Sequence, residues 1–213
     1  MRKQLSRKMI ETSESAWMAI AMLTFFHRLP DGEVEAGILT TDNGFDRASK
    51  LLELYKNSLA KKLYLTGAIA GMIGEDVDVH AEMVRAWLVE RSVPKADIVV
   101  DMKGMHANTQ SLEITKLLER DGVKTASLTV SPYFQPRQFL TFLPAMEKVG
   151  YKFKLYSQPA DDLNWFSIPH EMDCPMYEMI AAEFQRIQSY QIKGDVATME
   201  ELVRYLKWRD ATC

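Results

Sequence analysis

Two arginines stand where helices are predicted to begin, and both have the chemistry to hold an anion. Arg47 follows a short apolar run, and Arg137 follows Pro136, a residue suited to the first position of a helix. Because the helix dipole disfavours a cation in the first turn, Arg47 is expected to have a negative partner. That partner is either an acidic neighbour, Asp42 or Asp46, or an anionic ligand group shared with backbone N–H groups. Guanidinium forks match carboxylate and phosphate, so two of them favour a nucleotide, a phosphate ester or an amino-acid-like ligand.

Small and polar residues follow the other apolar runs and would add carboxylate, amide and hydroxyl groups to such a site. They are Asp42, Asn43, Gly67, Asn108, Thr109 and Ser131. A structural explanation stands beside the functional one, because Gly, Asn and Asp dominate turns whatever a protein does. Asn108 in particular suits the N-cap of a helix over 109–120, where it needs no ligand.

The stretch at 76–82 has the residue types of a metal site. Its four candidate ligands alternate along the chain, so they would share one face of a strand but not of a helix. They are Asp76, Asp78, His80 and Glu82. The apolar pattern after Ala81 is helical, which favours a charged helix start over a metal site. We therefore predict no metal, and His80 remains a candidate for proton transfer, since histidine titrates near neutrality.

One catalytic motif and two phosphate-binding motifs are absent at the predicted strand ends. Ser131 ends a predicted strand, but the G-x-S-x-G pattern of a nucleophile is not present around it. Ser131 is thus expected to donate its hydroxyl to a ligand or to the backbone. The glycines at 67–74 have neither the Gly-Lys-Ser/Thr ending of a phosphate loop nor the spacing of a dinucleotide turn.

These residues need a scaffold, and the alternation of apolar runs with helical periodicity predicts one. Five runs read as strands: 37–40, 62–66, 97–100, 126–130 and 151–156. Strands that are apolar throughout and separated by helices form a parallel sheet with helices on both faces and right-handed crossovers. The last run carries Lys152 and Lys154 on one face, which suits an edge strand. In such a sheet ligands bind outside the carboxyl ends of the strands, so the polar residues above are expected to converge there.

Composition narrows the class of protein. The chain has 213 residues with 26 Lys and Arg against 29 Asp and Glu, a net charge of −3 that argues against nucleic acid as a partner. Its two cysteines, Cys174 and Cys213, form no disulfide framework or metal pair. A reducing, cytoplasmic location fits best. Neither the oligomeric state nor the identity of the ligand follows from composition.

An apolar segment at 16–26, after a basic start, resembles a signal peptide. Glu11 and Glu14 interrupt that pattern, and a span of the membrane takes about 20 apolar residues. Ser13 suits the N-cap of a helix here. A helix packed on the domain is preferred to a secretory or anchoring segment, and no membrane span is expected.

The chain is expected to be a single domain over 1–213. Its core would span 36–156, followed by a linker and C-terminal helical extension over 157–213. Within the extension, Pro175 can start one helix. Thr198 and Glu201 have the spacing of a capping box for a second helix.

Between 38 and 150, several features follow one another in the order known from one family. They are Arg47 opening a helix, "LYLTGA", "HAEMVRAWLVERSVP", "IVVD", the pair Asn108-Thr109, and "SPYFQPRQF". This succession covers a little over half the chain and resembles the YdcF-like family, which includes the SanA and ElyC envelope proteins. The resemblance implies an α/β Rossmann-like three-layer fold with a mostly parallel five-stranded sheet and a polar pocket at the strand ends. It also makes S-adenosylmethionine a candidate ligand, since a member of the family is reported to bind it.

The chain departs from that family pattern at ionisable positions. His80 replaces the usual glutamate, and Phe134 stands where a histidine is expected. Ala68 replaces a second glycine, and "QSL" follows Asn108-Thr109 in place of the family's signature. We therefore expect an uncharacterised protein that binds a small anionic or nucleotide-type ligand. The alternative is a hydrolase or transferase acting on a phosphorylated or nucleotide-linked envelope precursor, with His80 as general acid or base.

Overall fold

The structure is a computed structural model that describes residues 32–40, 45–67, 80–160, 164–168 and 173–211. The helix expected over 16–26 lies outside these ranges. No helix within them combines the length and apolarity needed to cross a membrane.

Five strands form one sheet in the order β3-β2-β1-β4-β5, and each neighbouring pair is parallel. Their bounds are β1 Val34–Thr40, β2 Ala60–Thr66, β3 Ile98–Asp101, β4 Thr125–Thr129 and β5 Lys154–Ser157. The expected parallel sheet is confirmed, and so is the edge position of β5. This last strand begins at Lys154, three residues later than predicted.

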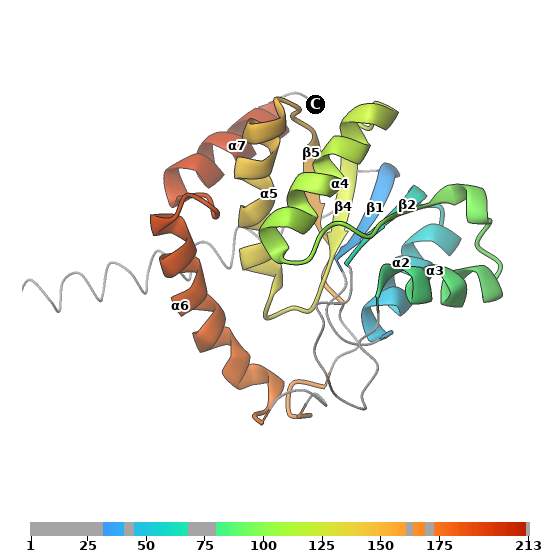
Figure 1. The fold of residues 1–213 in the computed structure, drawn as a ribbon, viewed down its shortest axis with the longest axis horizontal. Helices are drawn as coiled ribbons and strands as arrows, with labels where there is room; N and C mark the ends of the chain where they lie inside the picture. Colours follow the sequence, from blue (N-terminus) through green and yellow to red (C-terminus); the bar gives the residue numbers. More distant parts are fainter. Residues whose placement is uncertain (1–31, 41–44, 68–79, 161–163, 169–172, 212–213) are drawn as a thin grey trace, which may run out of the picture.

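Helices cover both faces of the sheet, which confirms the three-layer α/β fold (Figure 1). Their bounds are α2 Asp46–Lys56, α3 Ala81–Glu90, α4 Ala107–Asp121, α5 Gln135–Val149, α6 Met179–Ile192 and α7 Met199–Ala211. Two short 3-10 turns, Lys95–Asp97 and Met176–Glu178, precede β3 and α6. α4 and α5 end at Gly122 and Gly150, whose φ values of 71° and 78° favour glycine.

Alternation along the central strand divides the core in two. Ile38 of β1 is buried with residues of α4 and α5, whereas its neighbour Leu39 is buried with residues of α2 and α3. Both side chains are almost fully buried, as a strand covered on two faces requires. The two helices that connect the first three strands, α2 and α3, therefore lie on one face of the sheet. The next helix, α4, lies on the other face and leads to β4.

The C-terminal extension packs on the α5 side of the sheet (Figure 1). The predicted capping box is confirmed, because the Glu201 carboxylate accepts the Thr198 N–H at 2.6 Å and the Thr198 hydroxyl accepts the Glu201 N–H at 3.3 Å. Pro175 precedes a 3-10 turn, so the long helix expected there begins only at Met179.

α7 also covers the open side of β5. The Tyr205 hydroxyl accepts the Leu155 N–H at 2.6 Å and donates to the Phe153 carbonyl at 2.9 Å. One helical turn later, Arg209 donates from Nη1 to the Leu155 carbonyl at 3.0 Å. Two side chains of a helix thus take the place of a sixth strand, which protects an edge that would otherwise invite pairing.

Candidate functional site

The chain reverses its direction across the sheet between β1 and β4. α2 follows β1 onto one face, and α5 follows β4 onto the opposite face. In open parallel sheets the ligand crevice lies at the carboxyl ends of two such strands, because the diverging connections leave a gap. We refer to the residues at these strand ends as the carboxyl edge.

A hydrogen bond joins the two connections at this point. Arg47 lies in the first turn of α2, and its Nε donates to the hydroxyl of Ser131, which follows β4. Both residues are buried, Arg47 with 7% of its surface exposed and Ser131 with none. The Ser131 carbonyl accepts the N–H groups of Phe134 and Gln135, so the same residue fixes the turn into α5. The structure therefore brings together two of the predicted residues from opposite sides of the reversal.

Other predicted residues at this point are not described. Asp42 and Asn43 lie outside the described ranges, and so does Ala68. Both alternatives for the negative partner of Arg47, an acidic neighbour and an anionic ligand, therefore remain.

Several buried polar atoms near the carboxyl edge have no hydrogen-bond partner in the described part of the chain. They are Thr40 Oγ1 at the end of β1, Thr129 Oγ1 at the end of β4, Gln135 Oε1 at the start of α5, and Ser157 Oγ at the end of β5. A buried polar group without a partner costs about 1–3 kcal/mol of stability. Such groups are rare in folded proteins, so their gathering near adjoining strand ends makes this region a candidate for binding a further partner.

The end of β2 holds the start of α3. Gly67 has a φ of 138°, which only glycine adopts readily, and its carbonyl accepts the Ala81 N–H at 3.1 Å. His80 is the N-cap residue of α3 and is thereby held beside the carboxyl edge. Its Nδ1 is buried without a hydrogen-bond partner among the described residues.

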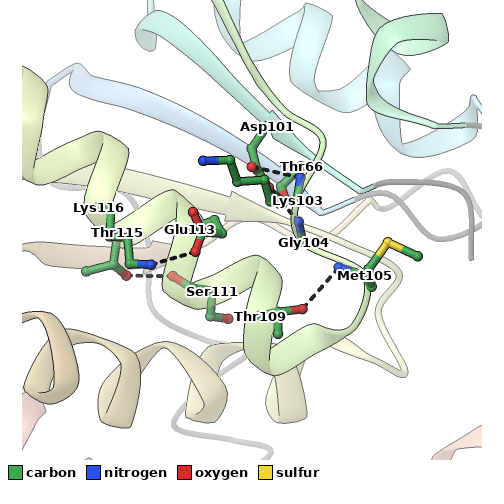
Figure 2. A network of polar contacts seen from close by, with 10 residues as sticks. All are labelled: Thr66, Asp101, Lys103, Gly104, Met105, Thr109, Ser111, Glu113, Thr115 and Lys116. Atoms are coloured by element: carbon green, nitrogen blue, oxygen red, sulfur yellow. Dashed lines mark hydrogen bonds and ion pairs between the residues drawn. The ribbon is translucent and has the colours of Figure 1, made fainter.

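The end of β3 is a closed polar network, which Figure 2 shows. Asp101 is 7% exposed, and its carboxylate accepts the Thr66 hydroxyl at 2.7 Å. It also accepts the backbone N–H groups of Lys103 and Gly104, at 3.0 and 2.9 Å. Because these three donors come from within the fold, Asp101 has a structural role in closing the loop before α4.

Asn108 does not cap α4 as predicted. The helix begins at Ala107 with His106 as its N-cap residue, so Asn108 lies inside the first turn. The cap is made instead by Thr109, whose hydroxyl accepts the N–H groups of Met105 and His106, both at 3.0 Å. Figure 2 shows the bond to Met105. The Asn108 amide is thereby left to donate to Asp195, at 2.6 Å, in the connection between α6 and α7.

Arg137 is bound by an acid that the sequence analysis did not select. Its Nε and Nη2 both donate to the carboxylate of Glu183 on α6, which is 2% exposed. Glu183 lies at helical spacing within the apolar stripe of α6, and an acid at such a position is a signal that could have identified it. Its pairing with Arg137 spans 46 residues and could not be read from local sequence.

The predicted residues therefore fall into two groups. Arg47 and Ser131 meet at the reversal between β1 and β4, with Gly67 and His80 at the end of β2. Asn108, Thr109 and Arg137 instead line a cavity of about 500 Å³ between α4, α5 and α6. Neither Arg47 nor Ser131 lines that cavity. Within the described ranges, no group of three or more His, Cys, Asp or Glu side chains is placed to hold a metal ion.

Comparison with protein-family models gives no match for this sequence, and comparison with curated proteins gives none either.

Proposed function

We propose that the protein binds a small anionic or nucleotide-type ligand at the carboxyl edge, between the ends of β1 and β4. The observation that carries the proposal is the buried hydrogen bond from Arg47 to Ser131 across the reversal of the chain. It brings a guanidinium group to the position where open α/β sheets bind ligands, and it restricts how that group is oriented.

The surroundings suit a ligand with both charged and neutral polar groups. The Arg47 guanidinium carries the charge that attracts phosphate or carboxylate. The backbone N–H groups of the first turn of α2 add donors at the same place. The hydroxyls of Thr40 and Thr129 can donate or accept, as the hydroxyls of a ribose would require. S-adenosylmethionine, which the family resemblance suggests, combines a carboxylate with such a ribose.

Thermal-shift measurements test this proposal with S-adenosylmethionine, AMP and inorganic phosphate. At least one of them should raise the melting temperature, because a ligand that binds only the folded state stabilises it by mass action. Ser131→Ala should weaken that ligand by about tenfold, equivalent to about 1.4 kcal/mol. Ser111→Ala is the matched control, since it also removes a fully buried serine hydroxyl, but in α4. Equal ligand response in the two variants would argue against a site at the carboxyl edge.

A second candidate function is hydrolysis or group transfer on a phosphorylated substrate, and the position of His80 favours it. His80 is the N-cap residue of α3, next to the end of β2. Its buried Nδ1 has no hydrogen-bond partner among the described residues and is therefore suited to exchange a proton with a bound substrate. Hydrolysis of p-nitrophenyl phosphate that is lost in His80→Gln, with ligand binding retained, would support this function. Activity unchanged by that substitution would remove His80 from the mechanism.

A further inference from the structure

We propose that the cavity between α4, α5 and α6 is a second binding site, and that it takes a small organic anion with an apolar body. The cavity has a volume of about 500 Å³, within the range of small-molecule sites. It is separate from the carboxyl edge described above, because neither Arg47 nor Ser131 lines it. Its walls come from the beginning of α4, the first two turns of α5 and the C-terminal extension.

The walls of the cavity combine apolar surface with one cation. Met105, Phe134, Tyr190 and Val196 supply the apolar part. Arg137 lies against the aromatic rings, with its Cζ 4.4 Å from the centre of the Phe134 ring and 5.7 Å from that of Tyr190. These contacts hold the guanidinium group against the wall, which reduces the entropy lost when it binds a ligand.

The charges around Arg137 do not cancel. Glu183 is shared by two guanidinium groups, because Arg186 on the same helix also donates to its carboxylate. Two positive charges against one negative charge leave this cluster with a net charge of +1. The cluster is partly desolvated, since the Arg137 and Glu183 side chains are 14% and 2% exposed. An anion entering the cavity would therefore be attracted more strongly than at the open surface.

Arg137 also keeps hydrogen-bonding capacity for a ligand. A guanidinium group has five N–H donors, and Glu183 takes one from Nε and one from Nη2. The donors of Nη1 and the second donor of Nη2 have no hydrogen-bond partner among the residues that the structure describes. They form the end of the fork, which can take a carboxylate or a phosphate with two parallel bonds.

One acid on the cavity wall opposes an anion, and its surroundings reduce that opposition. Asp195 accepts a hydrogen bond from the Asn108 amide at 2.6 Å, and its carboxylate lies 3.7 Å from the Lys148 ammonium group. The first turn of α4 adds the positive end of its helix dipole on the same side, because Ala107 and Asn108 are lining residues. The balance of fixed charge in the cavity thus favours an anion.

Titration calorimetry with three probes of the same shape tests the proposal on the full-length protein. Phenyl phosphate and benzoate each carry an anionic group on an apolar ring, whereas benzyl alcohol carries none. We expect at least one of the two anions to bind at least tenfold more tightly than benzyl alcohol. The stronger of the two identifies the head group as phosphate or carboxylate. Equal or weaker binding of both anions would overturn the proposal.

Two substitutions at neighbouring methionines locate the binding. Met105 lines the cavity and is 39% exposed, whereas Met102 lies three residues away, is 40% exposed and does not line it. Met105→Trp fills the cavity and should weaken the bound anion at least tenfold, while Met102→Trp should leave its Kd unchanged. Equal Kd values in these two variants would place the probe elsewhere and contradict the proposal.

The last variants separate this site from the carboxyl edge. Arg137→Lys keeps the charge but loses the fork, and should raise the Kd of the anion at least fivefold. Ser131→Ala should not change that Kd, because Ser131 does not line the cavity. A loss of probe binding in Ser131→Ala that equals the loss in Arg137→Lys would merge the two sites and overturn the inference.

Discussion

The polar groups at two margins of the same sheet differ in whether they have hydrogen-bond partners. Along the open side of β5, Tyr205 and Arg209 of α7 give the backbone groups of the edge strand hydrogen-bond partners. At the carboxyl edge, the buried hydroxyls of Thr40 and Thr129 have no partner in the described ranges. The backbone groups of the first margin are satisfied by α7, whereas the second has hydrogen-bonding capacity that the described residues do not use.

This difference distinguishes polar groups with a structural role from polar groups of a candidate binding site. Polar groups that the fold satisfies are expected to affect stability when removed, and to leave ligand binding unchanged unless, as Ser131 does for Arg47, they orient a group of the candidate site. Polar groups that the fold does not satisfy are expected to do the reverse, because their burial costs stability and their use comes from a further partner. The substitutions below are ordered by the size of their expected effect on stability.

Arg209→Ala should have the largest effect. The side chain is 1% exposed and donates to the Leu155 carbonyl, so truncation leaves both a cavity and an unpaired edge carbonyl. We expect the free energy of unfolding in urea to fall by about 3 kcal/mol. A fall of less than about 1 kcal/mol would mean that the edge strand does not depend on α7.

Gly104→Ala should destabilise the protein by about 2 kcal/mol, because it disturbs the satisfied polar network at the end of β3. A Cβ at this position would lie 2.6 Å from Thr66 Oγ1 and 2.7 Å from the Cα of Gln110, and the second contact is with backbone. Chemical denaturation measures the change. An unchanged free energy of unfolding would show that the loop before α4 can shift. The network at the end of β3 would then not differ in its effect on stability from the hydroxyls of Thr40 and Thr129, which have no partner in the described ranges.

Tyr205→Phe should cost about 1–2 kcal/mol, because it leaves the Leu155 N–H and the Phe153 carbonyl buried without the hydroxyl. Burial also raises the pKa of the Tyr205 hydroxyl. The folded-state pKa is then above the unfolded value of about 10, so stability is present below pH 10 and is lost as the pH rises beyond it.

The pH dependence supplies a check that truncation alone does not. Urea unfolding midpoints of the wild type should fall between pH 9 and pH 11, and those of Tyr205→Phe should fall less. Some alkaline loss should remain in the variant, because burial raises the pKa of Tyr64 in the same direction. Identical pH profiles would contradict the role given to the Tyr205 hydroxyl.

Thr129→Val should have the smallest effect on stability. The informative quantity is the sign of the change in the free energy of unfolding. The substitution replaces a buried hydroxyl that has no partner among the described residues by a methyl group of similar size, so stability should stay within about 0.5 kcal/mol or rise. The ligand response in thermal-shift assays should nevertheless decrease. Thr115→Val is the matched control, because the Thr115 hydroxyl donates to the Ser111 carbonyl at 2.7 Å. Its removal should lower the free energy of unfolding.

Much of the scaffold was predictable because it depends on local patterns. Apolar runs with helical periodicity between them indicated the parallel sheet, and the spacing of Thr198 and Glu201 indicated the start of α7. The cap of α4 was assigned wrongly, since Asn108 is a favoured cap type and His106 is not. Side-chain preference at a helix start was outweighed by the position of Thr109.

The candidate site was less predictable because it depends on contacts distant in sequence. The pairing of Arg47 with Ser131 spans 84 residues, and it follows only from the order in which the strands lie. Arg209 was not selected, because arginine is rarely buried unless it is paired. Its burial becomes intelligible only once β5 is known to present an open backbone.

The most direct test of the account compares ligand-induced thermal shifts in Ser131→Ala and in Tyr205→Phe, using S-adenosylmethionine, AMP and phosphate. Both variants lose one buried hydroxyl that forms hydrogen bonds, and each should be less stable than the wild type. We predict that Ser131→Ala reduces the ligand-induced shift and that Tyr205→Phe keeps it at the wild-type size. A shift that is unchanged in Ser131→Ala, or that is reduced equally in both variants, would contradict a ligand site at the carboxyl edge.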